Sequence, residues 1–147
     1  MHRASAREDS IRAREKPASA SWLPKPVLVL PLPKNLRKHM DYFFNWQQHT
    51  GSKPDKFYKT TLFQGAHLMV GLNCLEPGQT QSAHAHDGAD KFYFVLAGSG
   101  TFTVGDEERP AEAGTVIAAP AGIRHGVTNS GTERLSLLVA IAPPPIR

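Results

Sequence analysis

Downstream of Phe57, short apolar segments alternate with turn-forming residues along the chain. Pro-Gly, Asp-Gly and other glycine-containing turn signals recur at intervals of roughly 7–11 residues, a spacing typical of an all-β sandwich or barrel. The segments between these signals predict eight strands, at 57–63, 66–75, 79–86, 91–97, 101–104, 115–119, 123–128 and 134–142. Eight short strands favour a jelly roll or a closed barrel.

The chain before residue 57 has a different character. Residues 1–26 are rich in Ala, Ser, Arg and Pro and show no sustained period, so we expect a disordered basic tail. Apolar residues recur with helical spacing from Asn35 to Gln48, which predicts a short helix. The predicted organisation is therefore a tail at 1–26, an extended segment with a short helix packing on the barrel at 27–56, and a β-barrel at 57–147.

The predicted strand at 91–97 is apolar on both faces. One face carries Lys91, Tyr93 and Val95, and the other carries Phe92, Phe94 and Leu96. Such a strand is expected to be buried on both sides. The Phe92 face would then be covered by the N-terminal helix or by a second subunit.

The segment at 66–75 is apolar mainly on the face formed by Leu68, Val70, Leu72 and Cys74. His67 has the opposite parity, so we expect it at the surface rather than in a site. Cys74 is the single cysteine of the chain, which excludes an intramolecular disulfide and favours a small buried residue.

The charge is unevenly distributed. Residues 1–26 carry six basic and three acidic groups, residues 27–60 carry six and two, and residues 61–147 carry five and eight, which sums to the formal +4. A nucleic-acid-binding core is excluded because its phosphate contacts would need a basic folded face, whereas the predicted barrel is acidic. No apolar run approaches the roughly 18 residues of a membrane helix, and the first 20 residues lack an apolar signal region, so we expect a cytoplasmic protein.

Candidate metal ligands lie near the end of the predicted strand at 79–86. On a strand, His84 and His86 project to the same face about 6.6 Å apart along the backbone, so both rings can converge on one ion. A third ligand must come from a neighbouring strand, and His125 is the candidate. Taken alone, a His-x-His pair fits two surface histidines equally well.

Two motifs, in order, resemble those of a known family. The first reads G-x5-H-x-H-x4-K-x6-G from Gly78 to Gly98, and the second reads G-x5-P-x-G-x2-H-x3-N from Gly114 to Asn129. They are similar to the two cupin motifs. The second matches at every position, whereas the first carries Lys91 where most cupins have a metal-binding glutamate. With its flanking strands, the resemblance covers roughly residues 57–142.

This resemblance implies an all-β fold, a double-stranded β-helix or jelly-roll cupin barrel, here with a short N-terminal helix. It also implies a divalent metal ion held inside the barrel by histidines, and frequent dimerisation, so we expect a homodimer. Iron, manganese, nickel and zinc remain equally acceptable as the metal. His84, His86 and His125 are the metal ligands that the resemblance assigns in this sequence.

Lys91 leaves three alternatives open, because an ammonium group in place of a carboxylate is repelled by a dication. The metal is held by three histidines alone, with Lys91 turned towards an acid or solvent. Alternatively, Asp90 supplies the carboxylate through a bulge. In the third alternative the barrel is metal-free, and Lys91 acts as a base or a carboxylate anchor.

Function is expected to follow from this site rather than from the fold. The main hypothesis is a metal-dependent enzyme acting on a small organic substrate, of the dioxygenase type, with Lys91 as a catalytic residue and Tyr93 contacting the substrate. A non-redox isomerase, lyase or decarboxylase is the alternative, with Lys91 or Tyr93 moving a proton. A non-enzymatic cupin that binds a small ligand is a third possibility. The expected partner is a small molecule, with no nucleic acid and no membrane.

Overall fold

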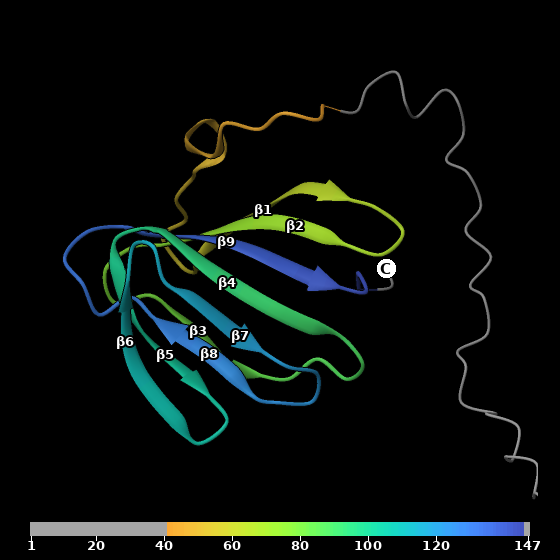
Figure 1. Ribbon diagram of the computed structural model, residues 1–147. Helices are drawn as coiled ribbons and strands as arrows, with labels where there is room; N and C mark the ends of the chain where they lie inside the picture. The colour runs from red at the N-terminus through yellow and green to blue at the C-terminus, as the bar shows by residue number, and fades with distance from the viewer. Residues whose placement is uncertain (1–40, 146–147) are drawn as a thin grey trace, which may run out of the picture. The chain divides into compact units, whose positions relative to one another are not determined.

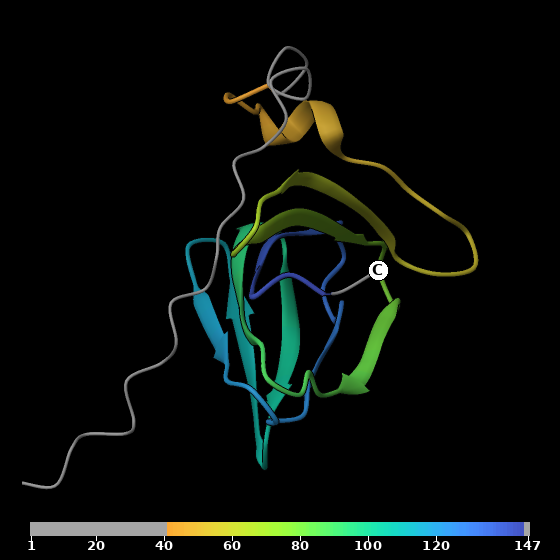
Figure 2. The same ribbon diagram turned by 90° about the vertical axis from the view of Figure 1, so that its right-hand side faces the viewer.

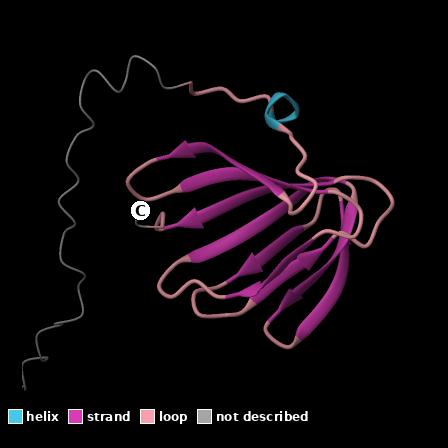
Figure 3. Ribbon diagram, turned by 180° about the vertical axis from the view of Figure 1, so that it is seen from behind, coloured by secondary structure: helices cyan, strands magenta, loops and turns pink. Residues whose placement is uncertain are grey.

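The computed structural model describes residues 41–145, which are nearly all β-structure (Figures 1 and 3). In that part of the chain there are nine strands and one short 3₁₀ helix, with these bounds: η2 Trp46–His49, β1 Tyr58–Gln64, β2 Met69–Leu75, β3 Thr80–His84, β4 Asp90–Ala97, β5 Ser99–Val104, β6 Glu107–Glu112, β7 Val116–Ala119, β8 His125–Thr128 and β9 Leu135–Ala142. The predicted all-β jelly roll is confirmed. None of the described helices has the length and apolar character needed to cross a membrane.

The strands form two antiparallel sheets whose inner faces oppose one another (Figure 2). One sheet has the order β1-β2-β9-β4-β7, and the other has the order β3-β8-β5-β6. Side chains from both inner faces build one apolar core, which contains Leu75, Tyr93, Val95, Phe102, Val127, Leu135, Leu137, Val139 and Ile141. The core fills one part of the space between the sheets, and a cavity occupies another part.

β6 was not predicted from the sequence, because four of its six residues are charged and one is proline. Pro110 cannot donate a ladder hydrogen bond, which argues against a central strand. In the structure β6 is the edge of its sheet and pairs only with β5, where Pro110 lies opposite Thr101. An edge position tolerates both the proline and the charges.

On β2, the residues that point into the barrel belong to the less apolar of the two faces of the strand. Gly71 and Asn73 line the internal cavity, whereas Val70 lines an external one. Leu72 and Cys74 have the parity of Val70 and are nevertheless fully buried. The more apolar face of β2 is therefore covered from outside the barrel.

The cover over Val70 encloses an external cavity of about 340 Å³. Its lining combines Phe44 and Trp46, which precede β1, with outer-face residues of four strands: Leu62, Phe63, Val70, Leu96 and Leu138. The expected helix at 35–48 is represented in the described residues by η2, with Asn45 as its N-cap and Thr50 as its C-cap. The tail at 1–26, and the part of that helix before residue 41, lie outside the described residues.

The outer face of β4 is only partly covered. Leu96 joins the cavity beside Phe44 and Trp46, whereas Phe92 is 38% exposed. Burial on both sides therefore holds for one end of β4 and not for the other. The homodimer expected from the resemblance stays a prediction.

Candidate metal centre

Three histidines converge inside the barrel. His84 ends β3, His86 follows it by two residues, and His125 begins β8 as the direct Cα partner of His84. One ligand atom from each ring lies within 4.8 Å of those of the other two. The ring centroids are 4.9 Å apart for His84 and His86, 4.7 Å for His84 and His125, and 5.4 Å for His86 and His125. The three-histidine cluster anticipated from the sequence is thus brought together.

A tight turn fixes the backbone that carries His86. Gly122 has a φ of +75°, and its N–H donates to the His86 carbonyl at 3.0 Å. Other residues adopt this left-handed conformation only with strain. The Pro120–Gly122 turn therefore ties the loop after β3 to the start of β8.

β3 and β8 also approach closely behind the site. A Cβ on Gly126 would lie 3.0 Å from backbone atoms of Ala83 and from the Gln81 carbonyl oxygen. The absence of a side chain at residue 126 therefore allows the close approach of the two strands that carry His84 and His125.

Hydrogen bonds set the tautomers of two rings. Nδ1 of His84 lies 2.8 Å from the Ser82 carbonyl oxygen, and Nδ1 of His125 lies 2.9 Å from that of Ile123. Because a carbonyl oxygen only accepts, each Nδ1 must carry the proton and donate it. In the neutral ring, Nε2 is then left with a free lone pair, which is the form that binds a metal ion.

Two of the histidine Nε2 atoms make no hydrogen bond in the described structure. Nε2 of His86 and Nε2 of His125 are buried, and neither has a hydrogen-bond partner among residues 41–145. Buried polar atoms are nearly always satisfied. Two orphaned ring nitrogens next to a third imidazole therefore fit a metal ion of the kind bound by nitrogen ligands.

The surroundings keep these rings neutral. Burial lowers the pKa of His86, with Lys91 and His84 adding to the effect. Burial also lowers the pKa of His125, as do the charges of Lys91, His84 and His86, and the hydrogen bond to Ile123 opposes this shift. Both rings are therefore ready to bind a cation without first losing a proton.

Lys91 points into the barrel rather than away from it. It is 6% exposed, and its Nζ lies 4.5 Å from the centroid of the Tyr93 ring. The ion pairs among residues 41–145 are Arg109–Glu107 and Arg134–Glu76, so Lys91 has no acidic partner there. Burial and the nearby Lys59 lower the pKa of Lys91 to about 8.

Two expectations about this position are therefore corrected, whereas the set of three histidine ligands stays a prediction. The side chain turns neither to an acid of the described residues nor to solvent. Asp90 does not replace the carboxylate either, because it is exposed and its Oδ1 accepts a hydrogen bond from the Ala121 N–H at 2.9 Å. It stabilises the Pro120–Gly122 turn from outside the cluster.

Tyr93 lies beneath the site. It is fully buried and does not line the cavity, and its hydroxyl donates to Oε1 of Gln81 at 3.3 Å. Burial raises the pKa of Tyr93, so this hydroxyl stays protonated. Asn73 Nδ2 donates to the same oxygen at 3.4 Å. Gln81 and Asn73 were not predicted as site residues. The signal that could have found them is a polar residue at an inward-facing position of each strand.

The cluster opens onto a cavity of about 410 Å³ between the two sheets. Its described lining consists of Phe57, Lys59, Thr60, Thr61, Gln64, Met69, Gly71, Asn73, Gln81, His84, His86, Lys91, Val139, Ile141 and Pro145. This volume accommodates a small organic molecule. A site of this kind can hold a metal ion on one wall and a substrate next to it.

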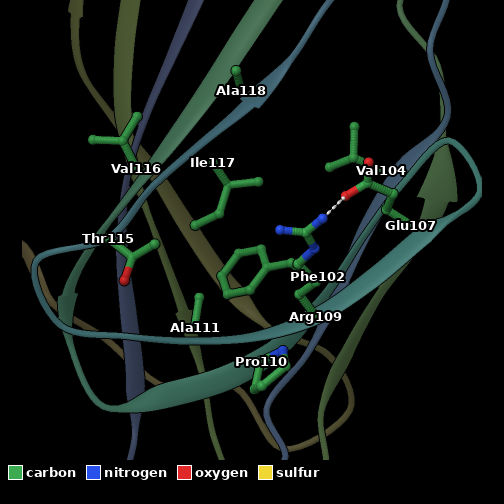
Figure 4. A pocket seen from close by; sticks show the side chains of 10 residues that line it. All are labelled: Phe102, Val104, Glu107, Arg109, Pro110, Ala111, Thr115, Val116, Ile117 and Ala118. Carbon is green, nitrogen blue, oxygen red and sulfur yellow. Dashed lines mark ion pairs between the residues drawn. The ribbon is translucent and has the colours of Figure 1, made fainter.

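A second cavity, of about 430 Å³, lies between β5, β6 and β7 (Figure 4). Phe102, Ile117 and neighbouring apolar residues line it, and the Arg109–Glu107 ion pair on its rim is exposed. No histidine or buried charge is among its described lining residues. The chemistry is therefore concentrated at the three-histidine cavity.

Comparison with known proteins agrees with this geometry. The family model described as "Cupin domain" matches residues 71–141, a span that includes all three histidines. An oxalate-binding protein of Thermotoga maritima is 33% identical over 83 residues, which cover 56% of this chain and 68% of that protein.

Solved structures show the same fold. A protein of Thermus thermophilus is 37% identical, with a TM-score of 0.68 over 70% of this chain and 98% of that one. A Klebsiella pneumoniae protein with a double-stranded β-helix domain is 21% identical, with a TM-score of 0.67 over 70% of this chain and 90% of that one. The predicted double-stranded β-helix is thereby confirmed.

Proposed function

The chain belongs to the cupin superfamily, and from this premise we propose that it is a metal-dependent enzyme that oxidises a small organic molecule with dioxygen. The observation that carries the proposal is the pair of buried, unpartnered Nε2 atoms of His86 and His125, which converge with the His84 ring. His84, His86 and His125 would hold the metal. A redox-active divalent ion with three protein ligands would supply open coordination positions and electrons for dioxygen chemistry.

The remaining residues of the site bind and orient the substrate. Lys91 presents an ammonium group to the cavity, next to the histidines. Tyr93 acts on the substrate indirectly, because its hydroxyl holds the Gln81 side chain that lines the cavity. In this reaction both atoms of dioxygen enter the substrate, so no further reductant is needed.

A non-redox reaction is the second candidate, and Lys91 favours it. A buried amino group with a pKa of about 8 exchanges protons near neutral pH, as the acid or base of an isomerase, lyase or decarboxylase must. Ligand binding without turnover is the third candidate, and the Thermotoga maritima relative is named an oxalate-binding protein. The three candidates share the metal site and the small-molecule cavity.

The metal site is tested by quantifying bound metal in protein purified without added metal. We expect close to one ion per chain in the natural protein and a large loss in His84→Ala. His67→Ala is the matched control, because His67 is exposed and outside the cluster. A natural protein that remains metal-free after loading with iron, manganese, nickel and zinc would contradict the proposal.

The reaction class is tested by oxygen uptake. The iron-loaded protein is offered a panel of small organic acids, and we expect substrate-dependent consumption of dioxygen that is absent in His84→Ala. Turnover of a substrate under nitrogen at an undiminished rate would instead identify the non-redox reaction. Saturable binding of an acid with no product under either atmosphere would identify a binding protein.

A further inference from the structure

The cavity beside the three histidines is positively charged. Its described lining contains two lysines, Lys59 and Lys91, and no aspartate or glutamate. A metal dication on the neighbouring histidines would add to this charge. Like charges that converge on one space repel one another unless a ligand of opposite sign lies between them.

Lys91 in particular lacks a counter-charge. Its side chain is almost fully buried, and the described residues offer it the face of the Tyr93 ring but no carboxylate. A buried ammonium group without an anionic partner is strongly destabilising, and a cation–π contact offsets only part of that effect. An anionic group delivered by a ligand would supply the missing partner.

Lys59 lies at a different depth in the same cavity. It is an exposed residue of β1, opposite Asn73 of β2, and its positive charge repels that of Lys91. The two ammonium groups therefore define an inner and an outer position for negative charge. A ligand with a single charge satisfies only one of them.

Gln81 adds a neutral donor to the inner position. Its Oε1 accepts from both the Tyr93 hydroxyl and Asn73 Nδ2. The oxygen is therefore hydrogen-bonded to the protein, whereas the amide nitrogen has no partner among the described residues. Because Gln81 lines the cavity, this NH₂ group is available to donate to a ligand oxygen.

We propose that the substrate is a small dicarboxylate, whose inner carboxylate meets Lys91 and the Gln81 amide while its outer carboxylate meets Lys59. The inference rests on the proposed function, because it names the substrate class of that same site. A cavity of about 410 Å³ has room for a dicarboxylate of a few carbons. Because Lys91, His84 and His86 line the same cavity, the inner carboxylate would face a metal ion held there.

The test is calorimetric titration of the full chain at pH 7, in metal-free form after chelation and again after metal loading. Three probes of similar length separate the charges: succinate, butyrate and succinamide. We expect succinate to bind at least tenfold more tightly than butyrate, and succinamide not to bind detectably. Malonate and glutarate then locate the best separation between the two carboxylates.

Variants assign each charge. Lys91→Met should weaken both acids at least tenfold, whereas Lys59→Met should lower succinate affinity to the level of butyrate and leave butyrate unchanged. Lys56→Met is the control, because Lys56 is exposed and not among the cavity residues, and it should bind as the natural protein does. Circular dichroism and thermal unfolding verify that each variant is folded.

The inference is overturned if succinate and butyrate bind equally, if Lys91→Met keeps full affinity, or if inorganic phosphate binds as tightly as succinate. Its failure is distinct from that of the proposed function. Metal bound by the natural protein together with charge-independent ligand binding would reject the dicarboxylate alone. Succinate binding that requires Lys91, in a protein that takes up no metal, would reject the metal enzyme alone.

Discussion

The ammonium nitrogen of Lys91 lies 4.5 Å from the centroid of the Tyr93 ring, two residues further along β4. The two side chains share the inner face of one strand, and the Tyr93 hydroxyl bonds to Gln81 across the barrel. β4 thus carries both the buried ammonium group of the cavity and the tyrosine that holds the Gln81 side chain. The consequences can be measured separately.

The buried charge of Lys91 should make stability depend on pH. The pKa of Lys91 is about 8 in the folded protein and keeps its ordinary value of 10.5 in the unfolded chain. Below pH 8 both states are protonated, and the folded state bears the full penalty of the buried charge. Between pH 8 and 10.5 the unfolded chain binds more protons, so the free energy of unfolding rises with pH.

We therefore expect Lys91→Met to be more stable than the natural protein at pH 7, by on the order of 3 kcal/mol, and the difference to disappear above pH 10.5. Urea unfolding of both metal-free proteins at pH 7 and pH 10.5 measures it. Lys59, Tyr93, His84, His86 and His125 are the other titratable groups around Lys91, and both proteins contain them. A difference independent of pH would contradict the assignment.

Restoring an acid at position 91 should strengthen metal binding. Lys91→Glu removes a repelled ammonium group and places a carboxylate on the inner face of β4, close to the three imidazoles. We expect at least a tenfold gain in metal affinity, measured by competition with a chelator of known affinity. Lys56→Glu adds the same charge at an exposed position and should change little. Weaker metal binding in Lys91→Glu would show that residue 91 does not face the cluster.

Eight of the nine described strands and the members of the histidine cluster were predictable because their sequence signals are local. Turn residues delimit short apolar segments, and the two motifs place His84 and His125 at the ends of strands that the fold pairs directly. Strand parity likewise placed Lys91 and Tyr93 on the same face of their strand, which the structure reproduces in the register of β4 with β9.

The remaining features depend on contacts between distant segments. On β2 the more apolar face points outward, where Phe44 and Trp46, from the segment before β1, line a cavity together with Val70. The orientation of Gln81 depends on the Tyr93 hydroxyl, which comes from the other sheet. A pattern within one segment contains no information about which partner will cover or contact it.

Removing the Tyr93 hydroxyl should affect ligand binding through Gln81. Tyr93→Phe deletes one of the two hydrogen bonds that hold Oε1, so the amide can rotate away from its donating orientation. We expect a loss of about 1 kcal/mol in stability and a several-fold weaker binding of succinate, with metal affinity unchanged. Calorimetry and chelator competition measure the two affinities. Tyr42→Phe, at an exposed tyrosine, is the control. An unchanged succinate affinity would show that Tyr93 only packs the core.

The Gly122 turn should be required for the geometry of the metal site and not only for stability. Gly122→Ala introduces a side chain at a φ of +75°, which costs about 1–2 kcal/mol and displaces the N–H that holds the His86 carbonyl. Gly114→Ala is a matched control, because Gly114 also has a positive φ, a donated backbone N–H and no atom near its missing Cβ, but it lies away from the histidines.

Both alanine variants should lose similar stability in urea unfolding, whereas only Gly122→Ala should lose metal affinity, by at least fivefold. Measuring the two quantities on both proteins separates strain from positioning. If metal affinity falls equally in both variants, it follows overall stability, and the turn has no particular role in placing His86. If it falls in neither, His86 keeps its position without the Gly122 hydrogen bond, and the cluster is held by the pairing of β3 with β8 alone.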